Sequence, residues 1–361
     1  MKKILYIVPH RYNRSPGQRF RCEHFIPWLR QHNFHITYAN LLTEWDDRHF
    51  YKPGNYLIKA FILLKSYFRR MRHLHSVQKY DAVFIYREAF MLGTIRFEKR
   101  IHRKGIPIIY DFDDAIWLND VSEANKELKW LKRPSKTGDI CSLSSLVIAG
   151  NEYLAAYARQ YAENVVVVPT TIDTNYHFAV NEAKLLDSVR IGWTGSSTTL
   201  KHFRLLLPVL KRLKAEFGEK LHVRVIADEP VIDNELEIEN VRWSAADEIQ
   251  RLGEIDIGIM PLPDDEWARG KCGFKGLQYM SMGIPAVMSP VGVNKEIIRH
   301  GENGFLAESD TEWEHILKNL IDDAQLRKKV GQIGRQTIID KYSILANRER
   351  YLKLFRAVVK G

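Results

Sequence analysis

The sequence predicts an α/β protein made of two tandem, doubly wound parallel sheets with helices on both faces of each. Two observations predict this fold. Short, fully apolar runs typical of buried parallel strands alternate with helical stretches, and the alternation restarts near the middle of the chain. The chain of 361 residues is also long enough for two domains of ordinary size. A ligand is expected in a cleft between the halves, at the carboxyl ends of the strands.

The first half of the chain accounts for the first predicted sheet. Its apolar runs, which we interpret as buried strands, lie at residues 3–8, 35–39, 82–86, 107–111, 146–149 and 165–168. Helices are expected at residues 20–32, 90–104 and 152–161. Residues 1–175 are therefore expected to form one domain. Residues 176–188, which show no hydrophobic period, are expected to be a linker.

The pattern of strands and helices restarts after this linker. Apolar runs that predict strands lie at residues 189–193, 223–227, 256–260 and 286–288. Helices are expected at residues 200–217, 274–282, 295–300, 311–340 (in two pieces) and 344–358. Residues 189–342 are expected to form the second domain, and residues 343–361 a terminal helix that packs back on the first domain.

Composition excludes several classes of protein. The three cysteines lie far apart and form no C-x-x-C pair, which argues against a disulfide scaffold or a zinc ribbon. The apolar N-terminal run stops at Pro9 without a cleavage site, so we interpret it as a strand rather than a signal peptide. Because no stretch reaches the roughly 18 uncharged apolar residues of a membrane span, a cytoplasmic protein is expected.

The net charge of +10 lies entirely in the first half of the chain. Residues 1–180 hold 27 basic and 17 acidic side chains, whereas residues 181–361 hold 27 of each. Residues 48–80 contain eight basic side chains, no acidic one, and many apolar and aromatic ones. This pattern predicts either a helix in peripheral contact with an anionic membrane or a core-facing helix with a solvated basic back. Nucleic acid is not an expected partner, because no recognition motif accompanies the charge.

Two glycine-containing loops precede helices in the second half. One follows the strand that ends at Trp193 and runs through residues 194–201, and the other covers residues 269–278. Backbone N–H groups at helix starts, together with nearby ammonium groups, suit a phosphate or diphosphate. The lysines and glycines concerned are Gly195, Lys201, Gly270, Lys271, Gly273 and Lys275. The alternatives are hydroxyl groups that merely cap the first helix and lysines that are incidental to a solvated loop.

The first half offers two polar segments that follow strands. Asp111, Asp113 and Asp114 come at the end of one strand and either bind ligand or cap the following helix. The loop after the first strand contains Gly17, Arg19 and Arg21, which suit an anionic acceptor group or the diphosphate of a donor, or form a basic surface turn. The thirteen histidines are scattered and no pair has the context of a metal site.

Together these motifs resemble glycosyltransferase family 4 of the GT-B fold, which has two Rossmann-like domains. The resemblance covers nearly the whole chain. It rests on Gly195 with Lys201, on the Pro261-Leu262 segment and above all on residues 271–287. Residues 290–298 and 303–305 look like the family's loop and turn after the next strand, and residues 149–154 and 168–170 look like its N-terminal half.

The resemblance implies a retaining transferase that moves a sugar from a nucleotide-diphosphate-sugar to a hydroxyl of a glycan or lipid-linked acceptor. The second half of the chain would bind the donor and the first half the acceptor, with no metal ion or other cofactor. Such activity belongs to cell-surface polysaccharide (capsule or lipopolysaccharide) assembly at the inner face of the membrane. The alternatives are a GT-B epimerase or phosphorylase, and a degenerate GT-B protein that acts as a membrane-surface scaffold.

The resemblance also implies roles for individual residues. The catalytic groups would be Asp113, Asp114, Lys201 and Lys275. The donor would be bound by Gly195, Ser196, Lys201, Lys271, Gly273, Phe274, Lys275 and Gln278.

Four positions depart from the family's pattern. Ser196 stands near the family's usual arginine, and Asp113 near its usual histidine. Gln278 replaces the glutamate that holds the ribose, and Gly270 replaces an earlier glutamate. Asp111-x-Asp113 additionally imitates the metal motif of the other large glycosyltransferase fold.

Overall fold

The computed structural model describes residues 1–52, 54–118, 133–178 and 188–360. The chain folds into two compact units. The first comprises Met1–Thr171 with Asn347–Gly361, and the second comprises Ile172–Ala346. Most of the expected linker, residues 179–187, lies outside the described residues.

The first unit is built on a parallel sheet of six strands in the order β2-β1-β3-β4-β5-β6. The strands are β1 (Lys2–Val8), β2 (Phe34–Asn40), β3 (Ala82–Tyr86), β4 (Ile108–Phe112), β5 (Leu146–Ala149) and β6 (Val165–Val167). The helices are α1 (Pro16–Arg21), α2 (Ile26–Gln31), α3 (Glu44–Phe50), α4 (Tyr56–His75), α5 (Arg96–Arg103), α6 (Lys136–Ser142) and α7 (Glu152–Ala158). The last helix, α16 (Ile344–Lys360), joins this unit from Asn347 onward.

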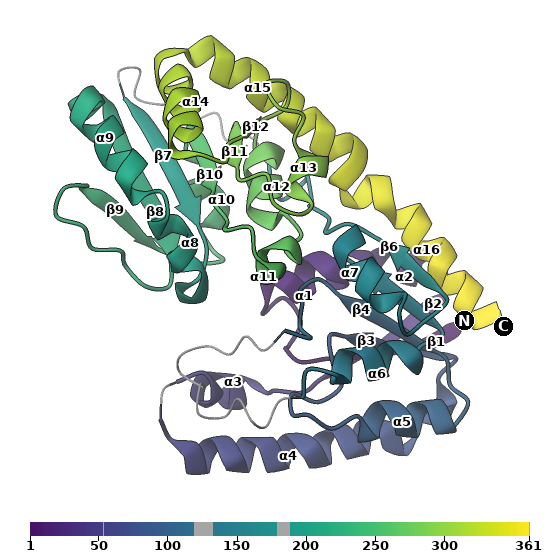
Figure 1. Cartoon of the computed structure of the whole chain (residues 1–361). Coiled ribbons are helices and arrows are strands. Elements are labelled where there is room, and N and C mark those ends of the chain that lie inside the picture. The colour runs from purple at the N-terminus through teal and green to yellow at the C-terminus, as the bar shows by residue number, and fades with distance from the viewer. Residues whose placement is uncertain (53, 119–132, 179–187, 361) are drawn as a thin grey trace. The chain divides into compact units, whose positions relative to one another are not determined.

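The second unit is built on another parallel sheet of six strands, in the order β12-β11-β10-β7-β8-β9. The strands are β7 (Val189–Thr194), β8 (Leu221–Ala227), β9 (Ile238–Arg242), β10 (Ile257–Met260), β11 (Ala286–Met288) and β12 (Phe305–Leu306). The helices are α8 (Leu200–Arg204), α9 (Leu207–Phe217), α10 (Glu248–Gly253), α11 (Glu266–Arg269), α12 (Phe274–Ser281), α13 (Asn294–Ile297), α14 (Asp310–Asp322) and α15 (Ala324–Thr337). Figure 1 shows each sheet with its flanking helices. The predicted fold class is therefore confirmed.

Each unit has its own apolar core. In the first unit the rings of Tyr6 and Phe84 stack with centroids 4.4 Å apart, and Phe355 of α16 packs 6.2 and 6.0 Å from them. Tyr351, one turn earlier in α16, stacks on Phe25 at 4.0 Å. In the second unit Trp193 of β7 lies in a cluster of buried aliphatic side chains from the sheet and from α9 and α14. Burial of such rings and chains is the main favourable term for both folds.

Several expected elements are interrupted or were not foreseen. The helix expected at 20–32 is divided into α1, a 3₁₀ turn at Glu23–Phe25 and α2, and the helix expected at 200–217 into α8 and α9. Pro27 and Pro208 lie at the starts of α2 and α9, where proline fits a new helix but cannot continue an old one. The edge strand β9 was missed because most of its side chains are solvent-accessible and form no apolar run. None of the described helices is long and apolar enough to cross a membrane.

Candidate active site

The strand order indicates where each unit should bind a ligand. In each sheet the chain adds strands on one side of the first strand and then crosses to the other side. The order therefore reverses between β1 and β3 and between β7 and β10. Ligands of such sheets bind beyond the carboxyl ends of the strands at this reversal. All of the predicted site residues follow β1, β4, β7 or β10 along the chain, so they lie at these ends of the two sheets.

The loop after β7 is closed by its own hydrogen bonds. The amide of Ser196 donates to the hydroxyl of Thr199 at 3.1 Å, and Ser197 donates to Asp228 through its amide at 2.5 Å and its hydroxyl at 3.0 Å. A Cβ added to Gly195 would lie 2.2 Å from the ring of Trp193, so only glycine fits there. The sequence left a capping role open for this loop, and the structure assigns it to Ser196 with Thr199.

The loop before α12 makes a tight turn into the helix. Gly273 precedes the helix with φ of +68°, a left-handed conformation that glycine adopts without strain. A Cβ at this position would also lie 2.3 Å from Cδ1 of Ile297. Phe274, the first residue of α12, is half-buried. This turn brings Lys275 into the first turn of the helix.

The charges of the three predicted lysines all act on one imidazole. His202, in α8, is buried, and its pKa is lowered to about 4 by burial and then by the positive charges of Lys275, Lys201 and Lys271. Within the described part of the chain, Nε2 of His202 has no hydrogen-bond partner. Three ammonium groups within electrostatic range of one buried ring make a concentrated positive site. This is the arrangement that an anionic group requires.

Two of these lysines lie over aromatic rings. Nζ of Lys275 lies 5.3 Å from the ring centroid of Trp193, and Nζ of Lys271 lies 4.6 Å from that of Trp267. Both contacts are cation–π interactions, which hold the ammonium groups without neutralising them. Lys201 is exposed on α8. The two cation–π contacts therefore help to orient the ammonium groups of Lys271 and Lys275.

Gln278 is held away from solvent by other polar side chains. It is buried, and its amide nitrogen lies 3.2 Å from Oε1 of Glu248 and 3.5 Å from Nε2 of His177. The bond to Glu248 uses the amide nitrogen as donor, whereas the ribose contact that the resemblance implies for Gln278 would use the amide oxygen as acceptor. Gly270, at the position of the other missing glutamate, is also buried. Asp265, which caps α11, carries a charge that opposes those of the lysines at His202.

In the first unit, residues from three strand ends converge on Asp113. The hydroxyl of Tyr86 donates to Oδ1 of Asp113 at 2.9 Å, and Nε of Arg87 donates to the same oxygen at 2.8 Å. A Cβ added to Gly17 would lie 2.8 Å from the Tyr86 hydroxyl and 3.3 Å from Oδ2 of Asp113. Gly17 therefore permits a close approach of this loop to Tyr86 and Asp113.

Arg87 is the functional candidate that the sequence reasoning missed. One of its terminal nitrogens lies 2.7 Å from Asp113 and 2.6 Å from Asp114, so it links both predicted carboxylates. Its φ of +60° is uncommon outside glycine and costs about 1–2 kcal/mol. Its amide donates to the carbonyl of Asp111 at 2.8 Å, and its carbonyl accepts from the hydroxyl of Tyr110 at 2.7 Å. The feature of the sequence that could have identified Arg87 is its position directly after the buried strand β3.

The prediction that Arg21 contacts a ligand is corrected by the structure. Arg21 is buried and donates to both oxygens of Asp111, at 3.1 and 2.8 Å, and to the carbonyl of Val168 at 2.5 Å. These bonds orient its guanidinium inward, where it joins α1 to β4. Arg19, by contrast, is half-buried with its guanidinium 4.6 Å from the ring centroid of Phe20. Asp111 is a structural partner rather than a ligand-binding group.

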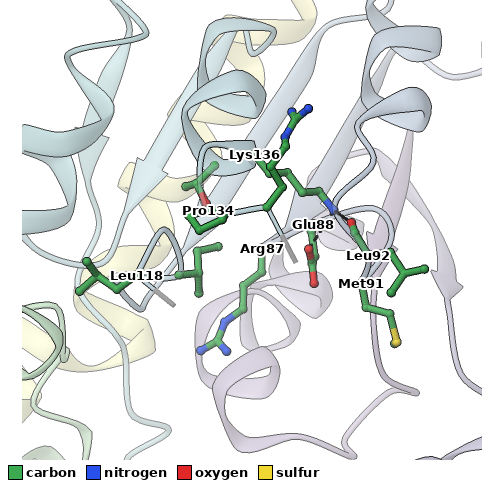
Figure 2. Close-up of a pocket in the computed structure, with 10 residues that line it drawn as sticks. Arg87, Glu88, Met91, Leu92, Leu118, Pro134 and Lys136 are labelled. Atoms are coloured by element: carbon green, nitrogen blue, oxygen red, sulfur yellow. Dashed lines mark hydrogen bonds and ion pairs between the residues drawn. The ribbon is translucent and has the colours of Figure 1, made fainter. Parts of the chain in front are cut away.

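A pocket of about 160 Å³ lies in the first unit next to Arg87. Figure 2 shows charged groups, Arg87, Glu88 and Lys136, together with apolar side chains around it. The buried Nζ of Lys136 donates to Glu88 at 2.9 Å and to the carbonyl of Leu92 at 2.7 Å. Because it combines charged and apolar walls, the pocket suits a polar ligand with an apolar face, such as a sugar ring.

The carboxylates of Asp111, Asp113 and Asp114 are paired with cations. In the Asp111-x-Asp113 motif, Asp111 binds Arg21 and Asp113 binds Arg87. Among the described residues, no group of three or more histidine, cysteine, aspartate or glutamate side chains is placed to hold a metal ion.

Comparison with known proteins finds one matching family model and several solved structures with a similar fold. Residues 188–323, which include the whole lysine cluster, match the family model described as glycosyl transferases group 1. A structure of Anabaena Alr3699/HepE in complex with UDP and glucose is similar over 99% of this chain and 100% of that chain, at 14% identity and a TM-score of 0.67. Sucrose-phosphate synthase from Thermosynechococcus elongatus is similar over 99% of each chain, at 11% identity and a TM-score of 0.72.

A third structure, a glycosyltransferase from Rickettsia africae, is similar over 100% of this chain and 99% of that chain, at 13% identity and a TM-score of 0.68. The fold of this protein is therefore that of the GT-B proteins, with two Rossmann-like units. The match of residues 188–323 to the group 1 model supports a glycosyltransferase, as the sequence predicted.

Proposed function

We propose that the protein is a retaining transferase of glycosyltransferase family 4. It transfers a sugar from a nucleoside-diphosphate-sugar to a hydroxyl of a glycan or lipid-linked acceptor, in the assembly of a cell-surface polysaccharide. The observation that carries the proposal is the group of three lysines around His202 at the strand reversal of the second unit. Similar folds that were solved with UDP and with UDP-glucose support a diphosphate donor. The proposed reaction uses no metal ion or other cofactor.

The lysines supply what the bond-breaking step needs. When the bond between the anomeric carbon and the diphosphate breaks, negative charge develops on the departing phosphate oxygen. Lys201, Lys271 and Lys275 offer three positive charges, placed before the reaction starts, that stabilise this oxygen. A diphosphate therefore needs no divalent cation to offset its charge in this site.

The first unit contributes the acceptor side and a negative charge. Arg87 with Asp113 and Asp114 forms a group of net charge −1, since one guanidinium is shared by two carboxylates. Such a group stabilises positive charge that develops at an anomeric carbon, or accepts hydrogen bonds from sugar hydroxyls. The adjoining pocket of about 160 Å³ is the proposed place for an acceptor sugar.

Donor binding is tested by thermal unfolding with UDP-, GDP- and ADP-sugars at millimolar concentration. A donor present at ten times its dissociation constant stabilises the native state by about 1.4 kcal/mol, which raises the melting temperature by roughly 3–6 °C. The base that gives the largest shift identifies the donor class. Absence of a shift with every donor would count against the proposal.

Catalysis is tested with the Lys275→Ala variant. Loss of one charge that stabilises the leaving group lowers turnover about 100- to 1000-fold, and it does so while the protein remains folded, which the melting temperature verifies. The control is Lys318→Ala, which removes a lysine on α14 that is paired with Glu216 and Glu314. Turnover of the Lys275→Ala variant at the level of this control would refute the assigned role.

A further inference from the structure

The outward face of α4 carries a continuous apolar stripe. Four large side chains on this 20-residue helix are exposed to solvent: Leu57 (88%), Phe61 (57%), Leu64 (57%) and Phe68 (63%). Their spacing of four, three and four residues places them on one side of the helix. Single exposed apolar residues are ordinary, whereas a row of four over three turns indicates a surface that contacts something apolar.

Several cations of the same helix bind acceptors within the first unit. Lys65 and Arg69 bind the buried carboxylate of Asp46, at 2.7 and 2.9 Å. Arg70 is buried and donates to the carbonyls of Ala89 and Ala39, at 2.7 and 2.8 Å. The sequence-based alternative of a helix with a solvated basic back therefore holds only in part, because internal acceptors bind Lys65, Arg69 and Arg70, whereas Arg72 is exposed. The apolar side chains consequently occupy much of the solvent face.

The remaining exposed cations lie at the two ends of the stripe. Lys52 precedes α4, and Arg72 and Lys79 follow Phe68, all of them exposed. Residues 48–80 contain no acidic side chain that would oppose them. Figure 1 shows α4 as a long helix beside α3 and α5 in the first unit. An apolar row bordered by cations matches the interface of an anionic bilayer, where acyl chains lie beneath negatively charged headgroups.

We propose that the Leu57–Phe68 stripe enters the boundary between headgroups and acyl chains of an anionic membrane, with α4 lying parallel to the surface. The helix does not cross the bilayer, because its inner face remains bonded to the first unit. The stripe spans about 16 Å along the helix axis at 1.5 Å per residue. This attachment deepens the proposed function, because it would place the first unit next to a lipid-linked acceptor. It rests on the helix alone and does not require the proposed reaction.

If apolar side chains insert into the membrane, two results are expected that charge attraction alone would not produce. Binding to vesicles of phosphatidylcholine with about 30% phosphatidylglycerol persists in part at high salt, because only the contribution of Lys52, Arg72 and Lys79 is screened. Replacing all four stripe residues with serine lowers the partition coefficient by about 100-fold or more at low and at high salt. Because the four side chains are exposed, this variant should keep its melting temperature.

A matched pair of single variants tests whether vesicle binding depends on the stripe itself or on any exposed apolar side chain. Leu57 is 88% exposed on α4, and Ile232 is 86% exposed in the second unit. In co-sedimentation with the same vesicles, Leu57→Ser lowers binding about threefold to tenfold, whereas Ile232→Ser leaves it unchanged. Sugar transfer to a soluble acceptor is measured in parallel, so that loss of membrane binding is distinguished from loss of catalysis.

Three results would overturn the proposal. The first is an absence of vesicle binding by the unmodified protein. The second is binding of the fourfold serine variant at the level of the unmodified protein. The third is a dimer in sedimentation velocity that the fourfold variant abolishes while neither protein binds vesicles, since the stripe would then contact a second copy of the chain.

Discussion

Replacing Arg21 with methionine tests whether this arginine holds the first unit together or contacts a ligand. In the structure, Arg21 and Asp111 form a two-point ion pair with N–O distances of 2.8 and 3.1 Å, and both side chains are almost wholly buried. Methionine keeps much of the volume of the arginine but removes its charge. Asp111 is then left as a buried carboxyl without its cation.

The size of the effect depends on pH. Removal of one partner from a buried ion pair typically costs about 3–5 kcal/mol, because the other charge stays buried without compensation. Burial raises the pKa of Asp111 to about 6 even though Arg21 lowers it. A carboxyl whose pKa is raised on folding contributes stability below its unfolded pKa of 3.8 and loses it as the pH rises through 6. The loss is about 3 kcal/mol, at 1.36 kcal/mol per pKa unit.

Without Arg21 the pKa of Asp111 rises further, so the carboxyl is protonated at pH 5 and ionises only at higher pH. The Arg21→Met variant should therefore lose about 3–5 kcal/mol of unfolding free energy at pH 8 and clearly less at pH 5. Urea denaturation at both pH values measures the difference. The Arg21→Met/Asp111→Asn double variant should lose the pH dependence.

Two outcomes would refute this reasoning. A loss below about 1 kcal/mol at pH 8 would mean that Asp111 is compensated without Arg21. Unchanged stability together with weaker binding of donor or acceptor would restore the ligand-binding role that the sequence predicted for Arg21.

Two further predictions concern the other parts of the site. Gly17→Ala should lower transfer about tenfold or more with little change in melting temperature, because the new Cβ would lie 2.8 Å from the Tyr86 hydroxyl and displace Asp113. Gly17→Ala/Tyr86→Phe should recover part of the rate, and no recovery would contradict the steric explanation. Binding of a nucleoside-diphosphate-sugar near pH 5 should take up protons, because an anion offsets the lysine charges that, after burial, help to lower the pKa of His202 to about 4. Calorimetry in buffers of different ionisation enthalpy should detect this uptake, and His202→Gln should abolish it; equal heats in all buffers would contradict the prediction.

Much of the fold and part of the site follow from local features of the sequence. Strands that are buried on both faces must be apolar throughout, so runs such as residues 82–86 are recognisable without any partner strand. The turn at Gly273 with Lys275 behind it is also local, because a left-handed residue before a helix requires glycine. The edge strand β9 and the interruptions at Pro27 and Pro208 were harder to predict, because exposed strands and short helices leave weak periodicity.

The sequence by itself determined the two wound sheets, the glycine turns at their strand ends and the residue types suited to bind a diphosphate. Only the tertiary structure decided which charges are available to a ligand. Arg21 meets Asp111 across 90 residues of chain, and Lys65 meets Asp46 across 19, so neither pairing is visible in a local pattern. The physical reason is that a buried charge must be compensated by a partner, and the fold alone determines which partner lies within reach.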